Sequence, residues 1–214
     1  MKKFLSILLS MVVILPMYSL QANAAIDNEN SFEEKSNKNY VSINDEDVSY
    51  SDVMTFSEMV EHYAKSAGIT YEEALNAFPA SEYSSYATPS YRTLSVGLNV
   101  SSEFKPRLEF YCQTSEYGTY WGIQKVYSMQ LVRSYNGISK QFSGNVEMWL
   151  RSAYQIEFVV NGDFYNNGTT TVTGGNNMQL GIGEYAQMSC SASISTTTNH
   201  YKYFYDHRTI NFQQ

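Results

Sequence analysis

From residue 91 to the end of the chain, short stretches of sequence place an apolar side chain at every second position. The first stretch carries four such residues on one face: Leu94, Val96, Leu98 and Val100. A period of two is that of a β-strand, whose successive side chains point to opposite sides of a sheet. About eight or nine stretches follow one another without a helical pattern, separated by turn residues such as Asn161 and Gly162. Residues 91–214 are therefore expected to form an antiparallel β-sandwich, with a β-barrel as the alternative.

One stretch breaks the alternation. The segment from Trp121 to Val132 is rich in residues that favour strands, but its phase slips near Lys125 and Val126. One extra residue in a strand shifts the alternation in this way, so the slip predicts a β-bulge.

A helical pattern precedes the β region. Thr55 and Thr70 each stand three residues before a glutamate, which is the capping-box signature of a helix start. Apolar residues after Thr55 recur at spacings of three and four: Phe56, Met59, Val60, Tyr63, Ala64 and Ala67. Gly68 is a suitable C-terminal stop because it adopts a left-handed conformation at little cost. Residues 55–79 are predicted to form a helical hairpin, joined to the β region by a linker at 80–90.

Acidic residues are concentrated before the β region. Between Asp27 and Glu82 there are 13 acidic and 3 basic residues, whereas from Tyr83 onward there are 8 acidic and 9 basic ones. Residues 25–54 are acidic, polar and without clear periodicity, so they are expected to be a flexible linker. The near-neutral β region favours contact with sugars, the cell envelope or another protein over electrostatic capture. Non-specific nucleic-acid binding, which needs many basic side chains, is excluded.

The N-terminus has the pattern of an export signal. Lys2 and Lys3 precede an apolar run at residues 4–15, and the small residues of Ala22-Asn23-Ala24 follow. The run is shorter than the roughly 20 residues that span a bilayer. We therefore predict a signal peptide at residues 1–24, cleavage between Ala24 and Ala25, and a secreted, extracellular protein.

The hairpin at residues 55–79 has two interpretations. It could pack on the β domain as a permanent part of the fold. Alternatively, together with the acidic segment before it, it could be a pro-region that is removed after export. The mass of the secreted protein distinguishes them, since the first predicts a chain starting at Ala25 and the second one starting near residue 80.

The two cysteines both fall on the apolar side of their stretches. Cys112 is in phase with Leu108 and Phe110, and Cys190 is in phase with Met188. In an exported protein, two inward-facing cysteines of one domain favour a disulfide. We therefore predict a Cys112–Cys190 disulfide, with two separate buried thiols as the alternative.

No catalytic motif with a recognised spacing is present in the sequence. It lacks Gly-x-Ser-x-Gly, His-Glu-x-x-His, a glycine-rich phosphate loop and Cys-x-x-Cys. The histidines, His62, His200 and His207, match no metal or catalytic spacing and are expected at solvated positions. Glu147 and Glu157 lie on outward faces of neighbouring strands and are the candidate pair for glycoside cleavage. We expect no cofactor, no metal and a non-enzymatic protein, with a carbohydrate-active hydrolase as one alternative.

Three aromatic residues fall on faces opposite the core. Tyr111, Trp149 and Tyr185 could stack on sugar rings or anchor a surface protein, and they could equally form ordinary cross-strand pairs. Two Ser/Thr alternations, at residues 169–173 and 189–198, resemble in composition the hairpins of small β pore-forming toxins. The prediction is an interaction module for a cell-envelope glycan or a surface protein, with a membrane-active protein as a further alternative.

The layout of the whole chain resembles that of small, largely uncharacterised secreted proteins of Gram-positive bacteria. The features that carry the resemblance are the Lys2-Lys3 signal, the acidic spacer, the segment from Thr55 to Pro79 and the β region rich in Tyr, Asn and Ser. The resemblance implies a secreted bacterial β protein, and it transfers no catalytic or binding residue.

Overall fold

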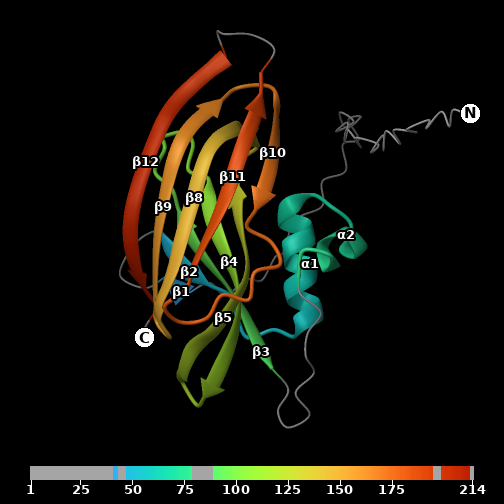
Figure 1. Ribbon diagram of the computed structural model, residues 1–214, viewed down its shortest axis with the longest axis vertical. Helices are drawn as coiled ribbons and strands as arrows, with labels where there is room; N and C mark the ends of the chain where they lie inside the picture. The colour runs from blue at the N-terminus through green and yellow to red at the C-terminus, as the bar shows by residue number, and fades with distance from the viewer. Residues whose placement is uncertain (1–40, 43–46, 79–88, 195–198, 213–214) are drawn as a thin grey trace, which may run out of the picture. The chain divides into compact units, whose positions relative to one another are not determined.

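The part of the chain whose structure is described excludes the N-terminus. The computed structural model describes residues 41–42, 47–78, 89–194 and 199–212. The predicted signal peptide, its cleavage site at Ala24 and Ala25, and most of the two predicted linkers lie outside the described residues. All described elements belong to one compact unit that begins at Asn37. Figure 1 shows its two layers of strands and, beside them, its helical hairpin.

Two five-stranded antiparallel sheets stack on each other. The first has the order β1-β2-β3-β4-β5 and the second the order β10-β11-β8-β9-β12. The strands of the first sheet are β1 (Val41–Ser42), β2 (Val48–Tyr50), β3 (Ser90–Gly97), β4 (Arg107–Tyr117) and β5 (Tyr120–Val132). Those of the second are β8 (Gln141–Ser152), β9 (Gln155–Tyr165), β10 (Thr169–Gly174), β11 (Tyr185–Ser193) and β12 (His200–Asn211). A small ribbon of β6 (Ser134–Tyr135) and β7 (Ile138–Ser139) connects them. The predicted sandwich is confirmed, and the barrel alternative is wrong because the sheets do not close on each other.

The main core lies between the two sheets and follows the predicted alternation. Leu94 and Val96 of β3 and Phe110 of β4 are fully buried from one side, and Met148 of β8 and Phe158 of β9 are fully buried from the other. In β8 and β9 buried side chains alternate with less buried ones, whereas β3 and β4 also bury side chains on their outer face. In all four strands the period of two determines which side chains enter the main core.

The predicted bulge is confirmed in β5. The register between β4 and β5 shifts between Tyr111 and Cys112, which pair with Ser128 and Val126 respectively, so Tyr127 is the extra residue. A second shift follows between Gln113 and Thr114. Because of the two shifts, apolar side chains of β5 point into the core both before and after the break in alternation, as Ile123 and Met129 do.

Both helices begin where the sequence predicts, and α1 also ends there, whereas α2 ends at Leu75, before the predicted boundary at residue 79. Helix α1 (Phe56–Ala67) starts at Thr55, whose side-chain oxygen accepts a hydrogen bond from the Glu58 amide while the Glu58 carboxylate accepts one from the Thr55 amide. The same reciprocal box at Thr70 starts α2 (Tyr71–Leu75). Gly68 ends α1 with φ at 68°, a left-handed conformation in which glycine has no steric penalty.

The helical hairpin covers the outer face of the first sheet. Buried residues of the hairpin form a second core with three tyrosines of that sheet, namely Tyr91, Tyr111 and Tyr127. Tyr63 of α1 packs edge-on against Tyr111, with ring centroids 5.0 Å apart. Tyr111 is therefore fully buried, and its predicted role as an exposed ligand contact is wrong. Its side chain does face away from the main core, but the hairpin occupies that side.

Two short strands, β1 and β2, form inside the segment expected to be a flexible linker. Residues 48–50 make β2, in which Val48 pairs with Val96 and Tyr50 pairs with Leu94 of β3. Both Val48 and Tyr50 are buried. The strand is too short to display a period of two, and acidic residues precede it, so the sequence pattern did not reveal it.

The predicted disulfide is not formed: Cys112 and Cys190 are both free and buried. Cys112 pairs with Val126 of β5, whereas Cys190 lines a cavity with Leu131, five residues further along β5. At about 3.3 Å per residue, this places the two cysteines on the order of 15 Å apart along the strand direction. A disulfide needs Cα atoms about 6 Å apart. Alternation indicated correctly that both thiols point inward, but not that they lie at different heights in the core.

Candidate binding face

The outer face of the second sheet has no helix on it, because both described helices lie on the first sheet. We call the outward side of β8, β9, β11 and β12 the open face. Its central residues are Glu147, Trp149, Glu157, Asn161, Tyr185, Tyr203, Tyr205 and His207. Tyr185, Tyr203 and Tyr205 are 46%, 54% and 55% exposed. The hairpin covers part of the other outer face, whereas none of the described helices lies on the open face.

Two of the three predicted contact residues meet on the open face. Trp149 of β8 and Tyr185 of β11 are direct cross-strand partners, with ring centroids 5.0 Å apart and planes inclined by 43°. Arg151 follows Trp149 by two residues on β8, and its guanidinium lies 5.2 Å from the Trp149 ring centroid. Burial, and then the charge of Glu147, raises the pKa of Tyr185, so its hydroxyl remains a hydrogen-bond donor. Together the two rings form an aromatic platform with polar groups at its rim.

A second aromatic pair lies across the sheet on β12. Tyr203 and Tyr205 are two residues apart and both point outward, and the Tyr203 hydroxyl donates to Asn161 at 2.9 Å. Counting strands and residues from Trp149 to Tyr205 gives a Cα separation on the order of 16 Å. The sequence pattern missed these two tyrosines because they stand in a run of aromatic residues. Phe204 and Ile210 stand at even-numbered positions of β12 and are buried. Tyr203 and Tyr205, at odd-numbered positions of the strand, therefore point outward.

Polar side chains fill the space between the two aromatic pairs. The Glu157 carboxylate accepts a hydrogen bond from Arg151 Nε at 2.6 Å and forms another with His207 Nε2 at 2.9 Å. These bonds, that from Arg151 first, lower the pKa of Glu157, so it remains a carboxylate that can accept further hydrogen bonds. Elsewhere on the face Ser189 donates to Asn145 at 2.9 Å.

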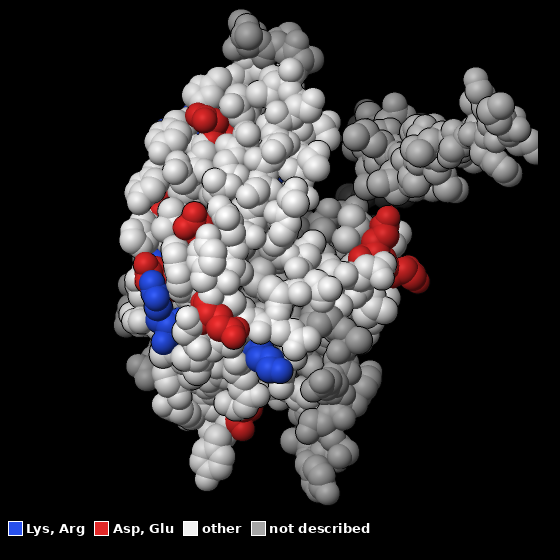
Figure 2. Space-filling view, viewed as in Figure 1, with Lys and Arg blue, Asp and Glu red and all other residues white. Residues whose placement is uncertain are grey.

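The open face carries few charges. Figure 2 shows this side of the molecule as largely uncharged, with isolated acidic and basic side chains. Of the acidic groups, Glu157 is paired with Arg151, and Asp163 is hydrogen-bonded to His200 at 2.8 Å. Amide, hydroxyl and aromatic groups therefore dominate the chemistry of the surface.

The candidate catalytic carboxylates also lie here. Glu147 pairs with Val159, two residues from Glu157, so the two carboxylates are diagonal neighbours about 7–8 Å apart at their Cα atoms. The criterion for a glycosidase pair is the separation of the carboxyl groups rather than of the Cα atoms, and the general acid of such a pair needs a raised pKa. The pKa of Glu157 is lowered instead. The arrangement supplies a stable anionic hydrogen-bond acceptor.

The histidines divide between the two faces. His200 and His207 lie on β12, where their side chains are half exposed, and both contact carboxylates of the open face. His62 is not at the solvated position expected from the sequence: it is partly buried on α1 at the covered face, where Nδ1 is 3.3 Å from the Thr93 hydroxyl oxygen. These positions bring no two histidines together in a common site.

The two Ser/Thr alternations pair with each other. Thr169–Gly174 of β10 runs antiparallel to β11, with Thr169 opposite Ser193 and Thr173 opposite Ser189. β11 is in turn hydrogen-bonded to β8. The alternations thus form an edge hairpin of the second sheet; residues 195–198 lie outside the described part.

No family model, curated protein or solved structure matches the chain. Among the described residues, no group of three or more His, Cys, Asp or Glu side chains could hold a metal ion. No helix in that same part of the chain is long and apolar enough to cross a membrane. The geometry and chemistry of the open face are therefore what bears on function.

Proposed function

We propose that this protein is a secreted, non-enzymatic binding module whose open face binds a carbohydrate of the cell envelope. The observation that carries the proposal is the cross-strand pair of half-buried Trp149 and exposed Tyr185 on a sheet face that no described helix covers. Secretion rests on the N-terminal signal pattern of the sequence.

The residue types of the open face suit a sugar. Sugar rings present C–H groups on their faces and hydroxyl groups at their edges. Trp149 and Tyr185 can stack on the first, while the Glu157 carboxylate and the Asn161 amide can hydrogen-bond to the second. The low charge of the face matches a neutral polymer better than a charged one.

The same residues favour a glycan over a protein partner. On the strands that form the open face, the exposed large hydrophobic side chains are all tyrosines: Tyr185, Tyr203 and Tyr205. The centre of a protein interface is usually a desolvated apolar patch surrounded by a polar rim. Here the aromatic groups are separated by polar ones, on the order of 16 Å apart. An extended polysaccharide can contact both aromatic pairs at once.

Cosedimentation tests the proposal. The exported chain is mixed with insoluble Gram-positive cell wall, chitin or cellulose, and the bound fraction is compared with that of a Trp149→Ala/Tyr185→Ala double variant. Tyr117→Ala is the matched control, because Tyr117 is 87% exposed and lies at the end of β4 in the other sheet. We expect one of these polymers to retain the wild type and the control alike, and the double variant to bind about tenfold more weakly.

Two results would overturn the proposal. One is that none of these polymers, and no glycan on an array of bacterial saccharides, binds the wild type. The other is retention that survives digestion of the wall glycan but is lost when wall proteins are digested, which would assign a protein partner.

A further inference from the structure

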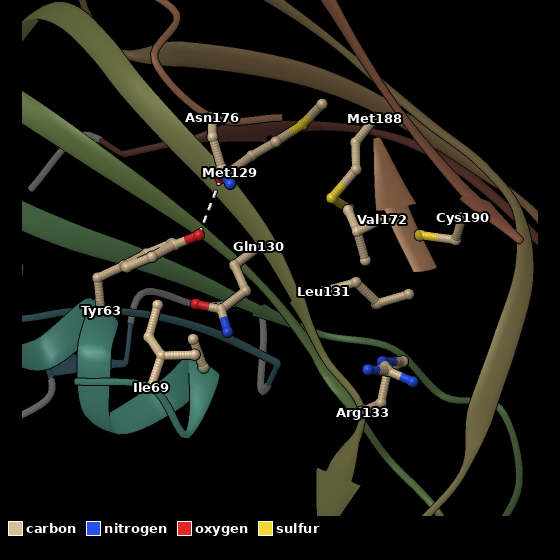
Figure 3. A pocket seen from close by; sticks show the side chains of 11 residues that line it. Tyr63, Ile69, Met129, Gln130, Leu131, Arg133, Val172, Asn176, Met188 and Cys190 are labelled. Atoms are coloured by element: carbon tan, nitrogen blue, oxygen red, sulfur yellow. Dashed lines mark hydrogen bonds between the residues drawn. The ribbon is translucent and has the colours of Figure 1, made fainter. Parts of the chain in front are cut away.

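A cavity of about 200 Å³ opens at the side of the sandwich, away from the open face. It lies between β5 of the first sheet and β10 and β11 of the second, and the end of α1 closes it from a third side. Figure 3 shows side chains from all of these elements converging on it. None of the residues that line it belongs to the open face.

The cavity exists because a loop pairs with β5 only part of the way along. The loop after β10 forms two backbone hydrogen bonds with β5. The Met178 amide donates to the Tyr127 carbonyl at 3.0 Å, and the Met129 amide donates to the Gly175 carbonyl at 2.8 Å. The side chain of the next residue, Asn176, contacts α1 and accepts a hydrogen bond from the Tyr63 hydroxyl at 2.9 Å. Past this point the cavity occupies the space between β5 and the edge of the second sheet.

The cavity wall is mostly apolar. Met129, Leu131 and Met188 are buried at its inner side, while Val172 and Ile69 are 44% and 38% exposed. Methionine side chains are flexible and polarisable, and they adapt to the shape of an apolar ligand. The two exposed aliphatic residues, Val172 and Ile69, give a ligand a route in from solvent.

One charged side chain faces this apolar wall. Arg133 follows β5, is partly buried, and donates from Nη1 to Gln141 Oε1 at 2.6 Å. No Asp or Glu of the described residues forms an ion pair with it. Burial lowers the pKa of Arg133, but a guanidinium remains protonated in proteins. A partly buried cation without an anionic partner is stabilised by a ligand that supplies one.

We infer that this cavity binds a small amphipathic carboxylate. Its apolar part lies among Met129, Leu131 and Met188, and its carboxylate pairs with the Arg133 guanidinium. A cavity of about 150 Å³ accommodates a benzene ring, so the volume here suits a chain of about six carbons or a single ring with a short acidic arm. The planar guanidinium can hold the carboxylate through two parallel hydrogen bonds.

The test uses hexanoate and phenylacetate as probes, and calorimetry on the exported chain measures their affinity. For ligands of this size we expect a Kd between about 0.1 and 1 mM. Hexanol, which has no anionic group, should bind at least tenfold more weakly. Arg133→Gln should weaken hexanoate binding at least tenfold and leave hexanol binding unchanged. Lys105→Gln, an exposed loop residue, removes the same charge elsewhere and should leave both unchanged.

A second variant keeps the test decisive if Arg133→Gln is poorly folded. Val172→Trp fills the exposed side of the cavity and keeps the guanidinium, so it should abolish binding while the circular dichroism spectrum stays that of the wild type. The inference is overturned if neither carboxylate binds the wild type at about 10 mM, or if Arg133→Gln and the wild type bind hexanoate equally. Neither outcome concerns the open face, so both are independent of glycan binding.

Discussion

Trp149 of β8 and Tyr185 of β11 stand opposite each other on the open face, with their ring centroids 5.0 Å apart. Tyr111 of β4 has the same outward phase, yet the helical hairpin covers it completely. The two outer faces of the sandwich therefore have different roles. One is an internal layer shared with α1 and α2, and the other is available to a ligand.

The hairpin is expected to be a permanent part of the fold. Met59 of α1 is fully buried against the first sheet, whereas Glu61 is exposed on the same helix. Met59→Ala should lower the free energy of unfolding by about 3 kcal/mol, because it leaves a cavity in the second core. Glu61→Ala should change it by less than about 0.5 kcal/mol. Urea unfolding of both variants makes the measurement.

The same packing predicts the mass of the secreted protein. Cleavage near residue 80 would remove the hairpin and β2 and expose Tyr91, Tyr111 and Tyr127. We expect an intact chain from Ala25, and a recombinant chain starting at residue 80 that aggregates or unfolds at lower urea concentration. A stable secreted species beginning near residue 80 would show that the hairpin is a pro-region.

How much of this the sequence predicted depends on the distance over which each feature acts. The capping boxes at Thr55 and Thr70 and the left-handed Gly68 are local: both helices begin at the boxes, and α1 ends at the glycine. Alternation likewise assigned the buried face of β3 and β8 correctly. Whether Tyr111 or Trp149 stays exposed depends on where the hairpin packs, and no local pattern contains that information.

The missed features have similar physical causes. β2 has only three residues and is stable because it pairs with β3, not because of its own pattern. The two cysteines share an inward phase, but register along the strands separates them. The outward Tyr203 and Tyr205 were obscured by neighbouring aromatic residues of either phase.

The thiols should remain free and unreactive in the native protein. Burial raises the pKa of Cys112 well above its ordinary value, and it raises that of Cys190 to about 11, with the Arg133 charge opposing the shift. Since the thiolate is the reactive form, we expect very slow labelling at pH 8 and two reactive thiols after unfolding. Dithiothreitol should not change the melting temperature. Finding no thiol in the unfolded, unreduced protein would contradict the structure.

Acid should destabilise the protein through Glu109, which is fully buried beneath the hairpin. Burial acts to raise the pKa of Glu109, but the charges of Arg107 and His62 and hydrogen bonds from Tyr111 and Arg107 lower it overall. A carboxyl whose pKa is lower in the folded state stabilises the fold above its unfolded pKa of about 4.3. This contribution is lost as the pH falls through the folded pKa.

Urea midpoints between pH 7 and pH 3 measure this effect. The wild type should lose stability below about pH 4.3, and Glu109→Gln should show a weaker dependence in that range. At pH 7 the variant should be about 2 kcal/mol less stable, because the neutral amide replaces a buried carboxylate that accepts hydrogen bonds from Arg107 Nε and the Tyr111 hydroxyl. Equal pH profiles for the two proteins would show that Glu109 is not the group responsible.

The Ser/Thr hairpin is expected to stay in its sheet. β11 pairs with β8 from Tyr185 to Cys190, so release of β10 and β11 would break these hydrogen bonds and expose Met188. We therefore expect no dye release from liposomes of anionic or zwitterionic lipid at neutral pH. Release that is abolished by substitutions confined to β10 would favour the membrane-active alternative.

The central claim is that the open face binds a glycan at Trp149. Trp121, the chain's other tryptophan, is 5% exposed in the core, so a ligand on the open face perturbs the emission of Trp149 alone. Titration with soluble glycan fragments of Gram-positive cell wall should give a saturable change in tryptophan fluorescence, and Trp149→Phe should abolish it. Binding of these fragments by calorimetry without a fluorescence change, or an unchanged signal in Trp149→Phe, would contradict the account.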